Sequence, residues 1–297
     1  LIYGGARNGQ ALLDATLYDP AAKSFAFTSG NLQSRHDTFT NSTLLKTGKV
    51  LVTGGDGVQG LTAELYDPPS KTFALTASML TDESNPNATA ELYTQTVLTD
   101  GRVLVAGCTA REQIYDPIVM PAGWTKTSGP SSRLPSLRCL ANSALLPNGK
   151  VLIAGGTSNF FDSLATAVEF DPANNTFAAT ANNMTQGRRV PQMVLLNNGK
   201  VLVFGGQAAS AGANLYDPAN RSFAATGSLK VARAMPSAAR LNSGKVLVAG
   251  GQDAQGNPLQ TAELYDPATA QFALIKSGGQ NVLMTKKRGG APALPVI

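Results

Sequence analysis

A seven-residue phrase recurs along this chain and constrains its fold more than any other feature. Lys-Val-Leu-Val-x-Gly-Gly spans Lys49–Gly55, Lys200–Gly206 and Lys245–Gly251, and Lys150–Gly156 carries Ile at the second Val. Arg102–Cys108 is a variant that ends in Cys, and Leu1–Gly5 is a truncated copy. The first glycines of the six copies are residues 4, 54, 107, 155, 205 and 250. A step of roughly 50 residues indicates a repeat architecture.

A second phrase follows each copy of the first. An aromatic residue precedes Asp-Pro at Tyr18, Tyr66, Tyr115, Phe170, Tyr216 and Tyr265. Another aromatic residue comes shortly afterwards, at Phe25, Phe73, Trp124, Phe177, Phe223 and Phe272, with a two-residue insertion before Trp124. The Asp side chain is suited to an Asx turn, and Pro presets φ for the next position. The repeat therefore contains a strand, a tight turn and a further strand.

Each repeat is predicted to form four short strands. The first two are joined by a two-residue turn such as Asn148-Gly149, where both residues tolerate positive φ. The Val-Leu-Val run is continuously apolar, which is typical of a strand covered on both faces. Small sheets of this kind cannot bury their own faces and stack on neighbours. We therefore predict an all-β chain, a closed six-bladed propeller of four-stranded antiparallel blades that forms a single domain over residues 1–297.

The two ends of the chain resemble complementary halves of one blade. Arg288–Ile297 resembles Arg233–Asn242, a first strand with no second strand after it, whereas the chain begins inside a second strand. We expect the C-terminal strand to complete the N-terminal blade, which would leave no free sheet edge.

Composition and charge exclude several classes of function. Lys and Arg exceed Asp and Glu by 24 to 19, and the one tight basic cluster is Lys286-Lys287-Arg288, best interpreted as a solvated tail. No basic stripe with interleaved aromatic residues is present, so we expect no nucleic-acid partner. No apolar run is long enough for a membrane span. The many Ser, Thr, Asn and Ala residues favour a secreted or periplasmic bacterial protein.

The chain has two cysteines, Cys108 and Cys139, and no Cys-x-x-Cys or Cys/His cluster, so a zinc site is not expected. We expect Cys108 to end one second strand and Cys139 to begin the first strand of the next blade. A disulfide between them is sterically allowed if their Cα atoms are close enough.

The Gly-Gly, aromatic-Asp-Pro and downstream aromatic phrases together resemble kelch repeats, of the kind found in the central propeller of galactose oxidase and in bacterial kelch proteins. The resemblance covers almost the whole chain and implies the propeller fold, but these are scaffold motifs. The copper centre of galactose oxidase uses two histidines, and this chain has only His36. We therefore expect no copper site, and we assign no metal or cofactor.

Candidate ligand-binding residues lie in the longer loops, which run from strand two to three and from strand four to the next blade. Counting back eleven residues from each turn glycine aligns Asp37, Ala90, Arg138, Arg188 and Arg233, and the resemblance at the end of the chain adds Arg288. Arg35, Arg189 and Glu91 lie nearby. One interpretation is a ring of guanidinium groups that binds a carboxylate, phosphate or sulfate. The other is that each Arg ties loops between adjacent blades by bonding backbone carbonyls, which repetition at a scaffold position favours.

Little chemistry remains outside the scaffold positions. Ser34, His36 and Asp37 are adjacent in one loop, but a catalytic triad depends on geometry between strands, so no catalytic residue is assigned. Phe160 and Phe161 either form a contact with a protein partner, or one of them packs over its own blade. We expect a non-catalytic module that binds a protein or extracellular polymer, or a subunit of a larger assembly. The alternative is an enzyme or binder for an acidic sugar that uses the rim arginines, as in a kelch mutarotase. A lectin is less favoured because Trp124 fills a scaffold position.

Overall fold

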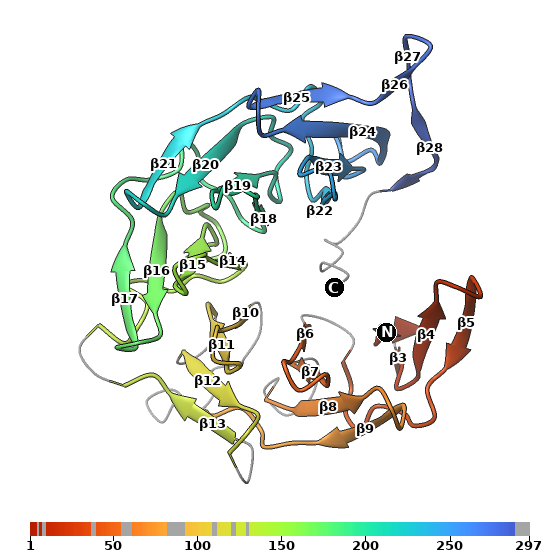
Figure 1. The fold of residues 1–297 in the computed structure, drawn as a ribbon, viewed down its shortest axis with the longest axis vertical. Coiled ribbons are helices and arrows are strands. Elements are labelled where there is room, and N and C mark those ends of the chain that lie inside the picture. Colours follow the sequence, from red (N-terminus) through yellow and green to blue (C-terminus); the bar gives the residue numbers. More distant parts are fainter. Residues whose placement is uncertain are drawn as a thin grey trace. The chain divides into compact units, whose positions relative to one another are not determined.

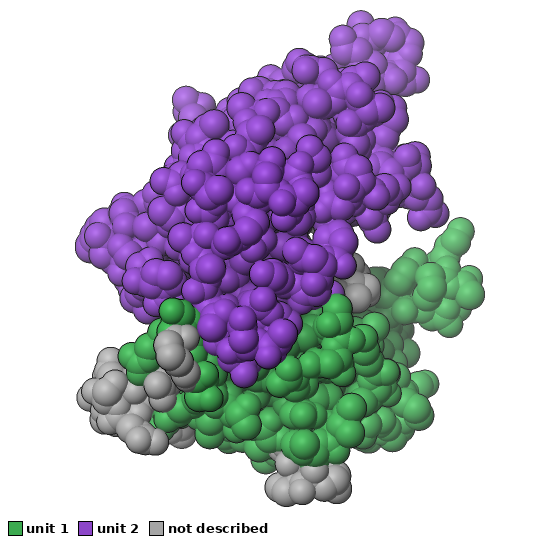
Figure 2. Space-filling model, turned by 60° about the vertical axis from the view of Figure 1, so that its left-hand side comes forward, with its two compact units in different colours: residues 1–133, 297 green, residues 134–296 purple. Residues whose placement is uncertain are grey.

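The computed structural model describes residues 1–4, 6–7, 10–36, 40–54, 61–81, 93–108, 112–119, 123–128 and 131–288. All regular elements in these ranges are β-strands, so the prediction of an all-β fold is confirmed (Figure 1). The chain divides into two compact units, one up to Arg133 and one from Leu134, which are described separately (Figure 2). Nothing tests the prediction of one domain over residues 1–297.

The first unit contains three blades. The first has β1 (Ile2–Tyr3), β4 (Ala15–Asp19) and β5 (Ser24–Phe27), beside the hairpin β2 (Ala6–Arg7) and β3 (Gln10–Ala11). The second has β6 (Asn41–Leu44), β7 (Val50–Thr53), β8 (Ala63–Asp67) and β9 (Thr72–Leu75). The third has β10 (Thr94–Val97), β11 (Val103–Ala106), β12 (Gln113–Asp116) and β13 (Gly123–Lys126). In each blade, every strand pairs antiparallel with the next strand of the same sheet.

The second unit also contains three blades. The fourth blade has β14 (Asn142–Leu145), β15 (Val151–Ala154), β16 (Ala167–Asp171) and β17 (Thr176–Ala179). The fifth has β18 (Gln192–Leu195), β19 (Val201–Phe204), β20 (Ala213–Asp217) and β21 (Ser222–Ala225). The sixth has β22 (Ser237–Arg240), β23 (Val246–Ala249), β24 (Leu259–Asp266) and β25 (Gln271–Leu274). The six blades and their four-stranded pattern agree with the predicted propeller.

The turn between strands one and two differs from the prediction. Leu45 N donates to Lys49 O and Gly48 N donates to Leu45 O, so the loop holds three residues rather than two. Only Gly48 has positive φ, at 84°, and Thr47 does not. This is a β-turn closed by a left-handed glycine, another common hairpin loop. In the fourth blade, Asn148 Oδ1 accepts the backbone N–H of Lys150. This hydrogen bond, and not a positive φ, explains why a polar residue occupies the position before the turn glycine.

The turn after strand three confirms the expected use of Asp. Asp171 Oδ1 accepts the N–H of Ala173, and Asp217 and Asp266 accept the equivalent N–H in their blades. The other oxygen pairs with the Lys that opens strand two, as in Lys200–Asp217 at 2.9 Å. The repeated Lys therefore joins the two phrases, a contact that the sequence analysis did not foresee.

The paired aromatic residues of one blade pack on the blade before it within each unit. Tyr115 and Trp124 are cross-strand partners with ring centroids 5.0 Å apart, so the two-residue insertion leaves the register intact. They share a core with Leu51 and Ala63 of the second blade. The pairs Tyr66–Phe73, Tyr216–Phe223 and Tyr265–Phe272 have the same arrangement. Each fully buried large apolar side chain contributes about 1.5–3 kcal/mol, so the stacked blades supply the core that one blade lacks.

The last part of the described chain departs from the repeat. After β25 comes the short hairpin β26 (Lys276–Ser277) and β27 (Gln280–Asn281), and then β28 (Leu283–Arg288), which pairs with β24. Lys286, Lys287 and Arg288 are therefore in a strand rather than in the tail that we expected, and Lys286 is exposed. The predicted closing strand falls mainly on residues 289–297, outside the described residues. The N-terminal blade has three strands among those described.

Candidate interaction surface

Three of the predicted rim arginines lie inside their own blades. Arg138, Arg188 and Arg233 are at most 2% exposed. Each Nη1 donates to the carbonyl of the first repeat glycine, which is Gly155, Gly205 or Gly250, at 2.7–2.9 Å. The same guanidinium groups also donate to the carbonyls of Thr166, Gly212 and Thr261, each of which directly precedes the Ala that pairs with the end of strand two. The loop that joins strands two and three is thereby tied to the start of strand one.

This geometry favours the scaffold interpretation of the arginines over the ligand ring. The bonds lie within one blade, and not between adjacent blades as we had expected. Burial lowers the pKa of Arg138 and of Arg188 to about 10, so both remain charged at neutral pH. Bonds to backbone carbonyls offset the cost of burying a charge. This arrangement indicates that the guanidinium groups stabilise the fold and do not bind an anion from solvent.

The remaining rim residues do not form one cluster in the described chain. Arg35 is exposed, and Arg189 is partly buried, with Nη1 donating to the Phe160 carbonyl at 2.6 Å. Arg288 lies in β28, and nothing of its side chain is described. Asp37 and Glu91 lie outside the described residues. An acidic-sugar site built from these residues stays a prediction.

The structure corrects the alignment of the loop that contains His36. Glu64 accepts the N–H groups of Gln33 and Ser34, as Glu263 accepts those of Lys230 and Val231. His36, three residues after Gln33, therefore occupies the position of Arg233, three residues after Lys230. Its Nε2 lies 3.2 Å from Glu64 Oε1, and the side chain is fully buried. Counting from the turn glycine chose Asp37 because this loop carries one extra residue.

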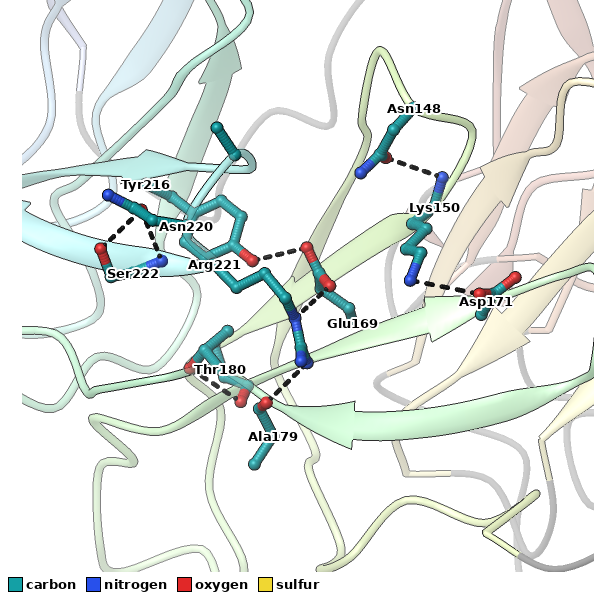
Figure 3. Close-up of polar contacts among 12 residues, drawn as sticks. Asn148, Lys150, Glu169, Asp171, Ala179, Thr180, Tyr216, Asn220, Arg221 and Ser222 are labelled. Carbon is teal, nitrogen blue, oxygen red and sulfur yellow. Dashed lines mark hydrogen bonds and ion pairs between the residues drawn. The ribbon is translucent and has the colours of Figure 1, made fainter.

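The three glutamates in strand three, Glu64, Glu169 and Glu263, are of two kinds, which was not predicted from the sequence. Glu64 and Glu263 stand three residues before the Asp of the Asp-Pro phrase, whereas Glu169 stands two before it. Because successive side chains in a strand point to opposite faces, Glu169 faces the fifth blade. It accepts hydrogen bonds from the Tyr216 hydroxyl at 2.6 Å and from Arg221 Nε at 2.7 Å (Figure 3). The spacing within the phrase was the signal that would have separated them.

Glu169 joins two blades and shows how a buried carboxylate is tolerated. Arg221 of the fifth blade also donates from Nη2 to the Ala179 carbonyl, so its guanidinium group makes two contacts with the fourth blade (Figure 3). Burial raises the pKa of Tyr216 above its usual value, and the hydrogen bond to Glu169 raises it further. The Tyr216 hydroxyl therefore stays protonated and acts as a donor. We interpret this group as a structural contact between blades.

The most exposed aromatic residue of the described second unit lies on a loop held in shape by its own side chains. Phe161 is 92% exposed and Phe160 is 50% exposed. Asp162 accepts from the Thr157 and Ser158 hydroxyls and from the Ser158 N–H at 2.6–2.9 Å. These bonds lower the pKa of Asp162 to about 2. The loop thus presents Phe161 to solvent in a fixed position.

Phe160 and Asn159 complete this loop. Asn159 Oδ1 accepts the N–H groups of Phe161 and Asp162 at 2.9 Å. Phe160 has φ of 66°, a conformation that costs energy in a residue other than glycine. Arg189 holds its carbonyl from the neighbouring blade. Strain of this kind persists only where surrounding contacts fix it, so the loop, named here the Phe161 loop (residues 157–162), is pre-organised.

Both cysteines of the chain, Cys108 and Cys139, are disulfide-bonded. No group of three or more His, Cys, Asp or Glu side chains that could hold a metal ion is found within the described ranges. In the same ranges no helix has the length and apolarity to cross a membrane.

Comparison with known families decides the identity of the repeat. A family profile described as the Kelch motif matches residues 235–278, which cover the four strands of the sixth blade. The other five blades repeat the same phrases in the same register. The chain contains a Kelch motif, and its described strands form six blades of the same kind. A search of curated proteins finds no match for it. The kelch assignment accounts for the scaffold, and kelch propellers commonly mediate protein–protein interaction.

Proposed function

We propose that this kelch propeller is a non-catalytic binding module that contacts a protein partner through the Phe161 loop. The single observation that carries the proposal is the 92% exposure of Phe161 on a loop fixed by hydrogen bonds. An exposed aromatic side chain of fixed conformation loses little entropy on binding and is typical of interface hot spots.

The charged residues of the second unit support binding rather than catalysis. Arg138, Arg188 and Arg233 donate to backbone carbonyls within their blades. Asp162 accepts from its own loop, and Asp253 does the same from Gln255 and Asn257. Groups that already serve the scaffold are poorly placed to move a proton or to bind an acidic sugar, so we do not carry the acidic-sugar alternative forward.

The proposal is tested by site-specific cross-linking followed by affinity measurement. A photoreactive amino acid is placed at Phe161 and, in a control variant, at Leu241, a partly exposed apolar residue at the turn end of the sixth blade. We expect one protein to be captured at position 161 and not at 241. With that protein purified, Phe161→Ala should weaken binding by about tenfold or more, and Leu241→Ala should have no effect. Equal binding by both variants would refute the proposal.

We further propose that the protein works in an oxidising compartment, either secreted or periplasmic. The observation in favour is the disulfide at Cys108 and Cys139, because structural disulfides are rare in reducing cytosol. Thiol labelling of the protein from intact source cells should find both cysteines blocked. Free thiols in freshly quenched material would exclude this compartment.

A further inference from the structure

The interior of the sixth blade contains a polar site that is fully occupied by one arginine. Arg233 Nη1 donates to the carbonyls of Gly250 and Thr261, and Nη2 donates to the Thr261 hydroxyl at 2.8 Å. Nε and Nη2 also donate to Glu263. Three acceptors on the backbone and on Thr261 therefore surround the end of the guanidinium group, and the carboxylate lies beside its nearer nitrogen.

The fourth blade repeats the three acceptors around the end of the guanidinium group, and Val168 stands where the sixth blade has Glu263. Arg138 Nη1 donates to Gly155 O and Thr166 O, and Nη2 donates to the Thr166 hydroxyl at 2.9 Å. Thr166 and Thr261 are equivalent, since each directly precedes the Ala at which strand three pairs with strand two. The arginine and the threonine thus form a matched pair in two blades.

In the second blade the threonine is kept and the arginine is replaced. Thr62 directly precedes Ala63, which pairs with Thr53, and Gly54 N donates to Thr62 O as Gly250 N does to Thr261 O. The residue opposite is His36, whose carbonyl lies 2.0 Å from a Cβ built on Gly4; Arg188 O lies 2.4 Å from one on Gly155. Two independent contacts, this one and the Glu64 bonds, therefore place His36 at the arginine position.

Histidine is shorter than arginine and satisfies only part of the site. Its Nε2 reaches Glu64, as Arg233 Nε reaches Glu263, and both distances are 3.2 Å. Nδ1 of His36 and the hydroxyl oxygen of Thr62 are buried, and neither has a hydrogen-bond partner among the described residues. In the sixth blade the distal guanidinium nitrogens of Arg233 bond the equivalent threonine. Histidine lacks these nitrogens, so the Thr62 hydroxyl and the second ring nitrogen are left without a partner in the described chain. An unpaired buried polar atom destabilises the fold, which favours a ligand that forms hydrogen bonds with both atoms.

We propose that the interior of the second blade is a binding site for one buried water molecule, held between His36 Nδ1 and the Thr62 hydroxyl. A carboxylate only accepts, so the proton of a neutral imidazole lies on Nε2, and Nδ1 needs a donor. Water supplies that O–H and can bond Thr62 with its other groups. Buried waters typically make about three bonds to polar groups that the protein leaves unpaired, and the carbonyls of Gly54 and Thr62 belong to the same site.

A high-resolution crystal structure and NMR test the site directly. We expect one ordered water within hydrogen-bond distance of both atoms. Because His36 is the single histidine of the chain, its ¹⁵N signals are unambiguous; they should show a protonated Nε2, an accepting Nδ1 and an NOE to a long-lived water. A proton on Nδ1, a direct protein partner for it, or no density within reach of both atoms would overturn the proposal.

Exchanging the two residues gives a second test. In His36→Arg the guanidinium group should displace the water, bond Thr62 and raise the unfolding temperature by several degrees. In the matched control Arg233→His, a water should appear beside Thr261 and the unfolding temperature should fall. Thr62→Val should remove the water signal from the histidine spectrum while the blade stays folded. A water NOE that persists in Thr62→Val would show that the site is placed wrongly.

Discussion

At the scale of single residues, the fold depends on backbone conformations that the repeat imposes. The last position of the turn after Asp-Pro has positive φ in five blades, at Lys23, Lys71, Asn175, Arg221 and Ala270. Positive φ is strained for most residues other than glycine. The residues found at these positions are therefore explained by their side-chain contacts rather than by the conformation of the backbone. Arg221 shows one such reason, because its side chain reaches Glu169. The repeat glycines are more strictly required, since several face a neighbouring carbonyl.

Two glycine substitutions distinguish the cost of positive φ from the cost of a steric clash between a new Cβ and a neighbouring carbonyl. At Gly48 φ is 84° and a Cβ would meet nothing within 4 Å, so Gly48→Ala should lower the free energy of unfolding by about 1–2 kcal/mol. At Gly155 φ is 71° and a Cβ would lie 2.4 Å from Arg188 O. Gly155→Ala should cost a further ~1–3 kcal/mol. Denaturant unfolding of both variants measures the difference, and equal losses would contradict the collision argument.

At the scale of the element, a loop can be as well defined as a strand when its side chains bond its own backbone. The Phe161 loop contains no regular structure beyond a single bridge residue, Thr157, which pairs with Cys139. Its shape comes from Asp162 and Asn159, each of which accepts from groups within five residues. Negative charge on Asp162 strengthens these bonds, so the loop should be sensitive to acid.

Acid should weaken this loop in a defined pH range. The pKa of Asp162 is lowered to about 2 in the folded protein, below the roughly 3.9 of an unfolded chain. The ionised carboxylate therefore stabilises the fold above about pH 4, and this contribution is lost as pH falls towards 2. Wild-type protein should unfold at a higher temperature than Asp162→Asn at pH 6, and the two should converge near pH 2. A gap that does not change with pH would contradict this mechanism.

At the scale of the whole molecule, stability comes from many small sheets and one covalent link. Every blade core in the described units is shared with a neighbouring blade, so the loss of one blade face removes a partner from the next. The disulfide adds a constraint that does not depend on packing. Both Cys108 and Cys139 are disulfide-bonded, and a disulfide restricts the unfolded state.

Reduction should therefore lower stability substantially. A disulfide typically contributes about 2–4 kcal/mol, so we expect a lower midpoint in denaturant when reductant is added. The double variant Cys108→Ser, Cys139→Ser should unfold at the midpoint of the reduced protein and should not respond to reductant. A reductant effect of the same size in that variant would show that the disulfide is not responsible.

Much of the fold was predictable because it repeats. The aromatic-Asp-Pro phrase and the Val-Leu-Val run fix strand period, turn position and burial locally, so six blades follow from counting. The turn at Gly48 was assigned the wrong length because Thr-Gly is compatible with two loop types. Their difference lies in the hydrogen bond from Leu45 N to Lys49 O, which no residue type specifies.

The candidate site was less predictable than the scaffold. Sequence alone selected Phe160, Phe161 and the arginine positions, but the depth of Arg138, Arg188 and Arg233 depends on how a loop folds back over strand one. It also placed Asp37 where the folded chain puts His36, because counting along a sequence cannot see one extra residue in a loop.

The amino-acid order by itself determined the repeat, the blades and the kelch assignment, because short-range spacing sets strands and turns. Tertiary structure alone decided which charged groups are buried, which carboxylate faces which blade, and which aromatic residue reaches solvent. The physical reason is that hydrogen bonding and burial join residues about 30 or more positions apart, such as Arg233 with Glu263 and Glu169 with Tyr216, and these partners meet only when the blades have formed.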